Sequence, residues 1–472
     1  MDFLRRDFLV GVGVVLLAGM LGGCQPANSQ TAKLKRPSIV FILTDDLGYG
    51  DLSCYGQQKF RTPNIDRLSQ QGIKFTDFYA GSTVCAPSRC SLMTGLHTGH
   101  CQIRGNLEMQ PEGQYPLKAQ TIMISTLLKE AGYKTGIFGK WGLGNPGSSG
   151  DPMNYFEEFY GYNCQRLAHN YYPEYLWHNR QKIMLNGKTY SHDLILDAAK
   201  SFIRTNKDKP FFCYMPVTIP HAAMHAPADL HEKYRQQFPQ FEDKTGTYAG
   251  PAVSNPVAAF PAMVEHLDNG IGEIMQLLKE LDIEEKTIVL FSSDNGPHRE
   301  GGHDPDFFDS NGPLRGYKRD LYEGGIRVPM LIRWPEKIEP GRVTSQVSAF
   351  WDVLPTVTDI AGIESPNESI DGISFVPTLL DQPGRQKQHR YLYWEFHEQG
   401  GKQAVRMGQW KAVRLNVKKD PASPIELYDL ENDLGETNNM ADEHPEMIQQ
   451  MKKIMTKART ENDVFRLQQT AQ

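Results

Sequence analysis

The chain has 472 residues, 39% of them hydrophobic and 22% charged, which is typical of a globular protein with one large domain and a smaller one. Its formal net charge of −6 argues against nonspecific binding to nucleic acid. An anionic ligand must therefore be attracted by a local group of cations, for which Arg89, Lys140 and Lys318 are candidates.

The first 24 residues resemble a bacterial export signal. Arg5-Arg6-Asp7-Phe8-Leu9 is similar to a twin-arginine motif, and the apolar run Leu9–Leu21 follows it. Leu21-Gly22-Gly23-Cys24 resembles a lipobox, which predicts a lipid on Cys24 and a polar tether over residues 25–35. An uncleaved membrane anchor is the alternative, but the apolar run is too short to span a bilayer. We therefore expect an exported lipoprotein, periplasmic or at the cell surface, anchored at Cys24.

Short apolar runs separated by helical patterns predict an α/β fold. The expected buried, mostly parallel strands are residues 37–44, 135–138, 211–217, 287–292 and 328–333. The expected helices are residues 121–131, 193–204 and 261–281. This alternation favours a large, mostly parallel sheet between helices, in a domain spanning residues 36–380.

The pattern changes after about residue 380. Four short segments are typical of antiparallel strands, and an amphipathic helix follows at Pro445–Arg459. The four segments are residues 391–396, 403–407, 410–414 and 426–429. We expect a small α+β subdomain over residues 381–472.

Polar residues follow four of the predicted strands. Asp45-Asp46, Lys140, His221 and Asp294-Asn295 each come at or soon after a strand end. Ligands of open α/β sheets bind beyond the carboxyl ends of the strands, so these side chains should converge at one edge. A helix cap or turn could explain each residue alone, but not all of them together.

A second candidate site begins at Cys85. In Cys85-Ala86-Pro87-Ser88-Arg89, the proline suits the first position of a helix, which would leave residue 85 just before a helix N-terminus. Free backbone N–H groups and partial positive charge at that end favour a bound anion, and Arg89 can add charge. A buried core thiol is the simpler reading of Cys85 alone.

The motifs together resemble the type I, formylglycine-dependent sulfatases of the alkaline-phosphatase superfamily, over nearly all of the chain after the signal. The run Cys85–Gly95 matches the signature C-x-P-S-R-x-x-x-x-T-G. The other matching segments are Phe41–Asp51, Gly132–Gly144, Pro220–Pro227, Ser292–Gly296, Leu314–Pro329 and Glu426–Asn439.

This resemblance implies hydrolysis of sulfate monoesters on sulfated carbohydrates. A maturation enzyme oxidises the family's cysteine to formylglycine, whose hydrated aldehyde attacks sulfur and then expels sulfate. By resemblance, Asp45, Asp46, Asp294, Asn295 and residue 85 hold one divalent cation, usually Ca²⁺. Arg89, Lys140 and Lys318 stabilise the sulfate oxygens, and His221 protonates the leaving oxygen.

One position departs from the family pattern. Many members read G-K-W-H-L-G, where the histidine takes a proton during sulfate release, but this chain has Gly142 there. His169, His298 and His303 are candidates for a replacement base. The aromatic segment Arg166–Trp177 and the loop His298–Asp304 are candidate sugar contacts, with His169, His298, His303 and Asp304 as the residues. Core packing and a solvated surface loop are the respective alternatives.

Three questions stay open at this point. A phosphodiesterase or phosphonate hydrolase of the same superfamily is an alternative activity, and Gly142 also admits a non-catalytic glycan-binding lipoprotein. Seven cysteines, with Cys24 and Cys85 assigned to other chemistry, predict no particular disulfide. The expected partners are a sulfated glycan, the maturation enzyme and the membrane.

Overall fold

The computed structural model describes residues 36–366 and 370–467. The predicted signal, the lipid site Cys24 and the tether lie outside the described residues. No helix within the described ranges has the length and apolar character needed to cross a membrane.

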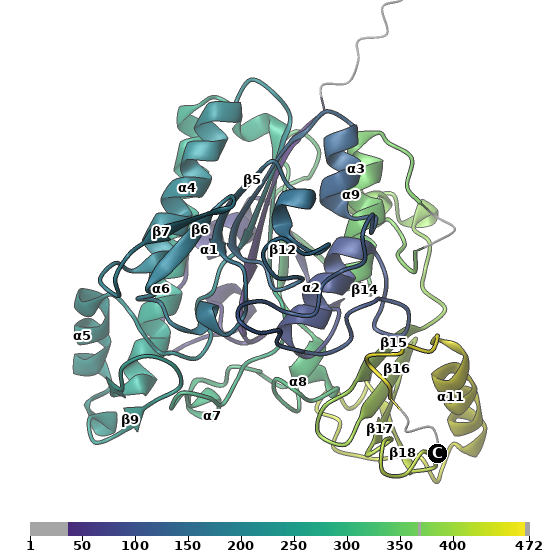
Figure 1. The fold of residues 1–472 in the computed structure, drawn as a ribbon. Helices are drawn as coiled ribbons and strands as arrows, with labels where there is room; N and C mark the ends of the chain where they lie inside the picture. The colour runs from purple at the N-terminus through teal and green to yellow at the C-terminus, as the bar shows by residue number, and fades with distance from the viewer. Residues whose placement is uncertain (1–35, 367–369, 468–472) are drawn as a thin grey trace, which may run out of the picture. The chain divides into compact units, whose positions relative to one another are not determined.

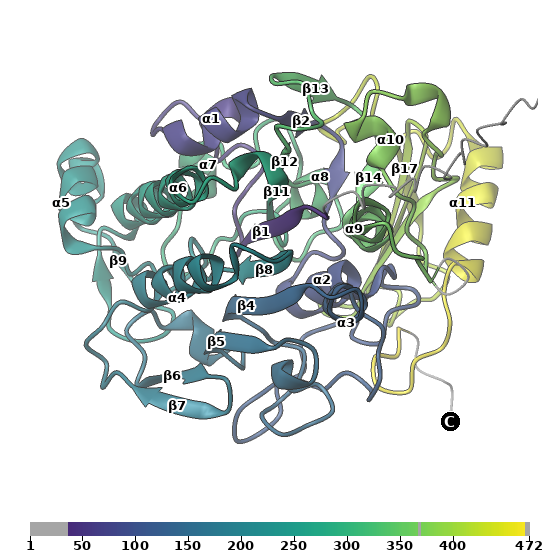
Figure 2. The ribbon, with the colours of Figure 1, turned by 90° about the horizontal axis from the view of Figure 1, so that it is seen from above.

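A ten-stranded sheet forms the centre of the molecule (Figures 1 and 2). Its order is β13-β2-β12-β11-β1-β8-β4-β5-β6-β7, and the five neighbouring strands from β11 to β5 are parallel. The strands, in chain order, are β1 Ser38–Thr44, β2 Ile73–Phe75, β4 Lys134–Lys140, β5 Glu158–Tyr162, β6 Tyr175–His178, β7 Gln181–Met184, β8 Phe211–Pro216, β11 Thr287–Ser293, β12 Met330–Arg333 and β13 Arg342–Thr344.

Helices cover both faces of this sheet. Helices α1, α4 and α6 lie on one face and α2, α3 and α9 on the other, as Figure 2 shows. The helices are α1 Pro63–Gln70, α2 Cys85–Thr94, α3 Ile124–Glu130, α4 Ser191–Asn206, α5 Ala228–Gln237, α6 Pro256–Glu280, α7 Pro305–Phe308, α8 Glu323–Ile326, α9 Val353–Ala361, α10 Val376–Leu379 and α11 Pro445–Lys457. The predicted sandwich of helices around a mostly parallel sheet is confirmed.

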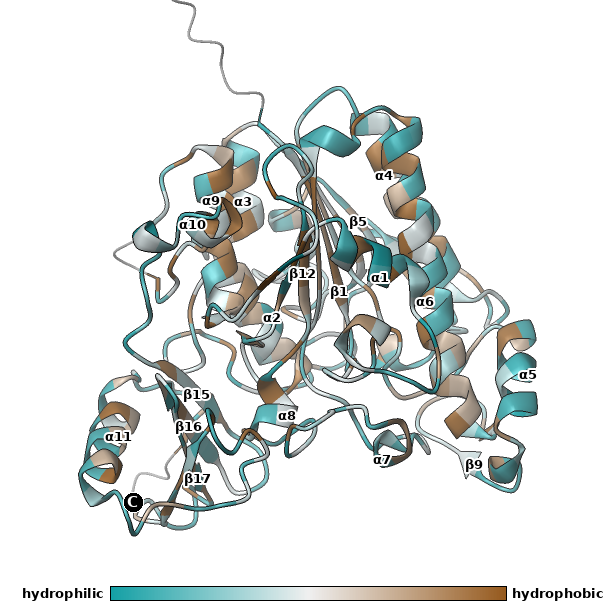
Figure 3. Cartoon of the chain, turned by 180° about the vertical axis from the view of Figure 1, so that it is seen from behind, coloured by the Kyte–Doolittle hydropathy of each residue, from teal (hydrophilic) through white to brown (hydrophobic). Residues whose placement is uncertain are grey.

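Strand β1 contributes side chains to two hydrophobic cores, one on each face of the sheet. Val40 and Ile42 pack with the residues of α4 and α6, whereas Ile39, Phe41 and Leu43 pack with those of α2, α3 and α9. Alternate side chains of a strand point to opposite faces, so a strand buried on both faces must be apolar throughout. Figure 3 shows the resulting apolar layer between the helices.

A second sheet lies in the C-terminal region (Figure 1). Its antiparallel strands run in the order β15-β16-β17-β18, and α11 packs on it. The strands are β15 Leu392–Phe396, β16 Lys402–Met407, β17 Trp410–Leu415 and β18 Ile425–Asp429. Two small pairs complete the fold: β3 Phe78–Tyr79 with β14 Ser348–Ala349, and β9 Thr245–Gly246 with β10 Val253–Ser254.

Three details differ from the predictions. Strand β12 is antiparallel to β11, because the chain leaves β11 at the carboxyl edge and re-enters the sheet from that same edge. Helix α6 begins at Pro256 instead of Pro261, since Asn255 Oδ1 accepts a hydrogen bond from Ala258 N (3.0 Å) and caps the helix there. Helix α3 begins three residues later than expected, at Ile124.

Candidate active site

The predicted strand-end residues converge at one edge of the sheet. Strand β1 lies between β11 and β8, with Thr44 opposite Ser293 and Leu43 opposite Pro216, so these strands end at the same level. The residues that follow them, together with Lys140 at the end of β4, are all buried: Asp45, Asp46, His221, Asp294 and Asn295.

Cys85 lies beside this group. It is the first residue of α2, and its Sγ is 3.4 Å from Lys140 Nζ. Helix α2 therefore begins earlier than Pro87, which occupies its third position, where a missing N–H still costs no intrahelical hydrogen bond. Ser88 Oγ donates to the carbonyl of Asp294 (2.6 Å), which fixes the start of α2 against the end of β11. Burial raises the pKa of the Cys85 thiol to about 12, so the unmodified thiol is a poor nucleophile.

Arg89 holds two of the strand ends in place. Its Nε and Nη2 donate to Asp294 Oδ2 at 3.0 and 2.8 Å, and Nη1 donates to the carbonyl of Lys140 at 2.8 Å. The resulting fork fixes the orientation of the carboxylate. Arg89 thus positions Asp294 as well as adding charge to the site.

Three carboxylates face one another next to Cys85. Oxygens of Asp45, Asp46 and Asp294 lie within 4.8 Å of one another. Burial, together with repulsion by Asp45 and Asp46, raises the pKa of Asp294 to about 7. Asp46 has a left-handed backbone (φ 65°), and its N–H donates to Asp294 Oδ1 at 3.1 Å. This turn brings the two chain segments together.

The donor set fits a hard divalent cation. Asp45 Oδ1 and Asn295 Oδ1 are buried and have no hydrogen-bond partner, which is costly unless a ligand satisfies them. Two oxygens on opposite sides of a calcium ion lie about 5 Å apart, close to the spread of the three carboxylates. All these ligand atoms are oxygens, which suits Ca²⁺ or Mg²⁺ better than zinc. The residues present therefore fit the metal that the family implies.

Lys318 and His221 form the opposite wall of the site. Lys318 Nζ lies 2.7 Å from Asp46 Oδ2 and 2.9 Å from His221 Nε2. His221 Nδ1 is 2.9 Å from the carbonyl of Ala222 and must donate to it, so Nε2 carries the free lone pair of the neutral ring. Burial and the charge of Lys318 lower the pKa of His221 well below its usual range. Lys318 Nζ therefore donates a hydrogen bond to His221 Nε2 and keeps its own proton.

Of the three candidate replacement bases, His169 reaches the site. Its ring stacks on that of His221 with centroids 4.0 Å apart, and its Nε2 is 3.4 Å from Lys140 Nζ. A short 3-10 helix, Leu167–His169, carries it there. Burial lowers the pKa of His169 well below its usual range, so the ring is neutral at pH 7 and can accept a proton.

The other predicted sugar contacts have structural roles. His298 Nε2 is 3.2 Å from the carbonyl of Pro220, and its Nδ1 accepts from Glu300 N. His303 stacks on Phe260 at 3.8 Å, and Asp304 caps α7. In the same loop Glu300 faces the site, with Oε2 3.2 Å from Lys318 Nζ, and the sugar contacts of the other three residues stay predictions.

At Gly142 a larger side chain would meet Gln165. Its φ is +78°, and a Cβ there would lie 2.9 Å from Gln165 Nε2 and 3.0 Å from Gln165 Cγ. Gln165 thus fills the space beside residue 142, and its Nε2 is buried without a partner. No motif in the sequence indicates that Gln165 occupies this space, and only its tertiary contact with Gly142 identifies it.

Aromatic residues of the segment Arg166–Trp177 form hydrogen bonds with other parts of the protein. Tyr171 donates its hydroxyl to the carbonyl of His221 at 2.8 Å, while Tyr175 and Trp177 both donate to Glu112. Hydrogen bonds within the protein thus hold these three residues, of which Tyr171 is buried and the other two are half-buried.

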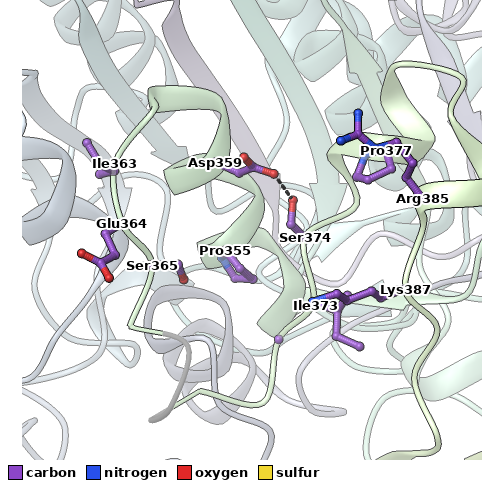
Figure 4. A pocket seen from close by; sticks show the side chains of 11 residues that line it. Pro355, Asp359, Ile363, Glu364, Ser365, Ile373, Ser374, Pro377, Arg385 and Lys387 are labelled. Carbon is purple, nitrogen blue, oxygen red and sulfur yellow. Dashed lines mark hydrogen bonds between the residues drawn. The ribbon is translucent and has the colours of Figure 1, made fainter.

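A separate surface pocket of about 630 Å³ contains none of the predicted site residues. It lies between α9 and the segment around α10, where Asp359 accepts a hydrogen bond from Ser374 at 2.9 Å (Figure 4). Its lining includes no cysteine or histidine.

The sequence of this chain matches those of known proteins over most of its length. The family model described as "Sulfatase" matches residues 37–363, and the model described as "N-sulphoglucosamine sulphohydrolase, C-terminal" matches residues 316–461. Human arylsulfatase A is 32% identical over 481 residues, covering 90% of this chain and 88% of that protein. N-acetylgalactosamine-6-O-sulfatase of Bacteroides thetaiotaomicron is 28% identical over 537 residues, covering 95% and 98%.

A solved structure extends the match to the fold. Ps i-CgsB in complex with k-i-k-neocarrahexaose superposes with a TM-score of 0.77 at 27% identity, covering 92% of this chain and 95% of that one. With the Cys85 signature at the start of α2 and the oxygen cluster beside it, these matches lead to one conclusion. The chain belongs to the sulfatase family and is a sulfuric ester hydrolase.

Proposed function

We propose that this enzyme removes sulfate from sulfated carbohydrates, with formylglycine at position 85 as nucleophile and Ca²⁺ as its metal. The observation that carries the proposal is the position of Cys85, 3.4 Å from Lys140 Nζ at the start of α2 and beside the oxygen cluster. The names of two matched proteins, an N-acetylgalactosamine-6-O-sulfatase and a complex with k-i-k-neocarrahexaose, support a carbohydrate substrate.

The modified residue and the metal supply what the twenty amino acids lack. Hydrated formylglycine supplies a hydroxyl that attacks sulfur and a second hydroxyl that lets sulfate leave. A calcium ion held by Asp45, Asp46, Asp294 and Asn295 supplies positive charge near the sulfate oxygens. The buried, unpartnered Asp45 Oδ1 and Asn295 Oδ1 support this assignment.

The chain's own residues bind the sulfate and move the protons. Lys140 and Lys318 lie on two sides of the site and would hold sulfate oxygens by charge and hydrogen bonds. Lys318, whose Nζ is held 2.9 Å from His221 Nε2, would protonate the leaving sugar oxygen, and His221 would orient it. His169, stacked on His221 and adjacent to Lys140, would take the proton that a histidine at position 142 takes in other members.

The route to this active form is part of the proposal. A maturation enzyme must oxidise Cys85, because the chain encodes a cysteine and the proposed nucleophile is a formylglycine. The twin-arginine and lipobox motifs support export and anchoring at Cys24, outside the cytoplasm.

Mass spectrometry of the peptide that contains Cys85 tests the nucleophile. We expect the cysteine to be replaced by formylglycine when the protein is produced with a maturation enzyme. Sulfate release from N-acetylgalactosamine 6-sulfate should then be lost in Cys85→Ala, by more than about 10⁴-fold, with the melting temperature nearly unchanged.

Two controls separate the alternatives. The same assay with an aryl phosphate and a phosphonate monoester identifies a phosphorus-centred activity if either is turned over faster than the sulfate ester. Full activity in Cys85→Ala would contradict the formylglycine mechanism.

A further inference from the structure

An exposed tyrosine stands at the mouth of the active site. Tyr248 lies between β9 and β10, and its ring meets those of His169 and His221 edge-on, with centroids 5.3 and 5.5 Å away. It is 40% exposed, although it contacts the buried His221 and the half-buried His169. Part of its surface is therefore available to a ligand.

The loop that carries Tyr248 is held against the site. His225 Nε2 donates to the carbonyl of Pro251 at 3.1 Å, and Lys244 Nζ pairs with Asp304 at 3.3 Å. Gly301 lies beneath the loop, where a Cβ would be 3.6 Å from that of Tyr248. The aromatic ring is thus positioned on the same side as the leaving-group pair, His221 and Lys318.

An ion pair forms the next part of the rim. Glu300 bridges Lys318 Nζ (3.2 Å) and Arg319 Nη1 (2.5 Å). The side chains of Glu300 and Arg319 are 21% and 30% exposed, so both can also contact a ligand. Arg319 has a left-handed backbone (φ 78°) and donates its N–H to the carbonyl of Thr83 at 3.1 Å.

We propose that Tyr248, Glu300 and Arg319 form the subsite for the sugar ring that carries the sulfate. This inference rests on the proposed function. A pyranose has an apolar C–H face, which stacks on an aromatic ring, and hydroxyl groups at its edge, which pair with carboxylate and guanidinium groups. Tyr248 supplies the aromatic surface, and Glu300 and Arg319 supply the charged groups. Both lie beside Lys318 and His221, where the sugar oxygen leaves.

Three sulfate esters of primary alcohols test the assignment: N-acetylgalactosamine 6-sulfate, cyclohexylmethyl sulfate and ethyl sulfate. They differ in whether the alcohol has a ring and whether that ring has hydroxyls. We expect Tyr248→Ala to lower kcat/KM for both ring substrates about tenfold relative to ethyl sulfate, and Tyr248→Trp to restore it. Arg319→Gln should lower the value for the sugar about tenfold relative to both other esters.

The controls distinguish this inference from the proposed function. Val343→Ala changes an exposed residue on the edge strand β13 and should leave all three ratios as in wild type. Equal effects of Tyr248→Ala on all three esters, or no effect, would overturn the subsite while leaving the sulfatase intact. A wild-type enzyme that hydrolyses the alkyl sulfates but not the sugar sulfate would instead refute the proposed carbohydrate substrate.

Discussion

Two buried clusters of charge in this protein have the same number of charged groups and different purposes. The active-site cluster combines three carboxylates with three cations: Asp45, Asp46, Asp294, Arg89, Lys140 and Lys318. A second cluster, which we call the joining cluster, links the C-terminal sheet to the main sheet. It also combines three carboxylates with three cations: Asp77, Glu323, Glu436, Arg327, Arg406 and Lys411.

The difference lies in how completely the groups are satisfied. In the joining cluster, Glu323 accepts from Lys411 (2.7 Å), Arg327 (3.2 Å) and Tyr79 (2.6 Å), while Glu436 accepts from Glu323 N (2.7 Å). Among the described residues, no carboxylate oxygen of this cluster is buried without a partner. In the active site, Asp45 Oδ1 and the adjacent Asn295 Oδ1 are buried without a partner. Between these two clusters, the unpartnered buried oxygens and not the number of charges mark the one that can hold a ligand.

The largest expected effect comes from breaking the joining cluster. Lys411→Met leaves Glu323 and Glu436 buried without their shared cation, so we expect the free energy of unfolding to fall by about 3–5 kcal/mol. Urea denaturation measures this. Lys419→Met, an exposed lysine a few residues later, is the control and should change the free energy by less than about 0.5 kcal/mol. A loss below about 1 kcal/mol in Lys411→Met would mean that the cluster does not hold the two sheets together.

The active-site cluster should respond to metal instead. Chelation by EDTA should lower the melting temperature and activity, and added Ca²⁺ should restore both, since binding at 100 times Kd stabilises the native state by about 2.7 kcal/mol. Asn295→Ala removes an unpartnered oxygen, and we expect activity to fall about 10²–10³-fold with a weaker response to Ca²⁺. Lys411→Met is the matched control and should keep the full response. Identical melting curves with EDTA and with Ca²⁺ in the wild type would contradict the metal assignment.

The third prediction concerns the pair His169 and His221 beside the active-site cluster. His169→Ala should slow sulfate release about 10²-fold while the first alcohol is still released, because the two steps use different proton acceptors. Rapid-quench measurements should show alcohol appearing ahead of sulfate in the first turnover. His298→Ala, which alters the ring packed behind His221, is the control and should slow both products equally. Equal slowing in His169→Ala would exclude it as the replacement base.

The sequence predicts best what depends on local pattern. Strands β1, β8 and β11 are recognisable because strands buried on both faces are apolar runs, and the polar residues after them mark the carboxyl edge. The exposed strand β7 and the short β2 lack such a run. Their places depend on partners far away in the chain.

The rim of the site is harder to predict than its centre. Cys85 and Asp45 belong to motifs, whereas Tyr248 lies on a short hairpin whose position is set by Gly301 and His225. Glu300 and His298 are two residues apart in one loop, but only Glu300 contacts Lys318. Which side chain of a loop faces a site follows from its tertiary contacts, and the loop sequence does not show them.

A smaller effect should come from Glu395, whose carboxylate oxygens, like those of the joining cluster, all have partners. Its carboxylate contacts Arg104 (2.8 Å), Arg459 (2.8 Å) and His397 (3.0 Å). Burial alone would raise the pKa of Glu395, but the His397 hydrogen bond and the two arginines lower it from 4.5 to about 2. A carboxyl group with a lowered native pKa stabilises the fold above its unfolded pKa, and this contribution is lost as pH falls toward the native value.

Glu395→Gln should therefore cost about 2–3 kcal/mol at pH 7, and the difference from wild type should shrink as pH falls from about 4.5 toward 2. Urea denaturation at pH 7, 5, 4 and 3 measures it. Glu461→Gln is the matched control, because Glu461 pairs with the same Arg459 at 2.8 Å but its side chain is 84% exposed. Exposed pairs contribute little, so this variant should differ from wild type by less than about 0.5 kcal/mol at every pH. A difference for Glu395→Gln that stays constant down to pH 3 would show that its effect comes from packing and not from charge.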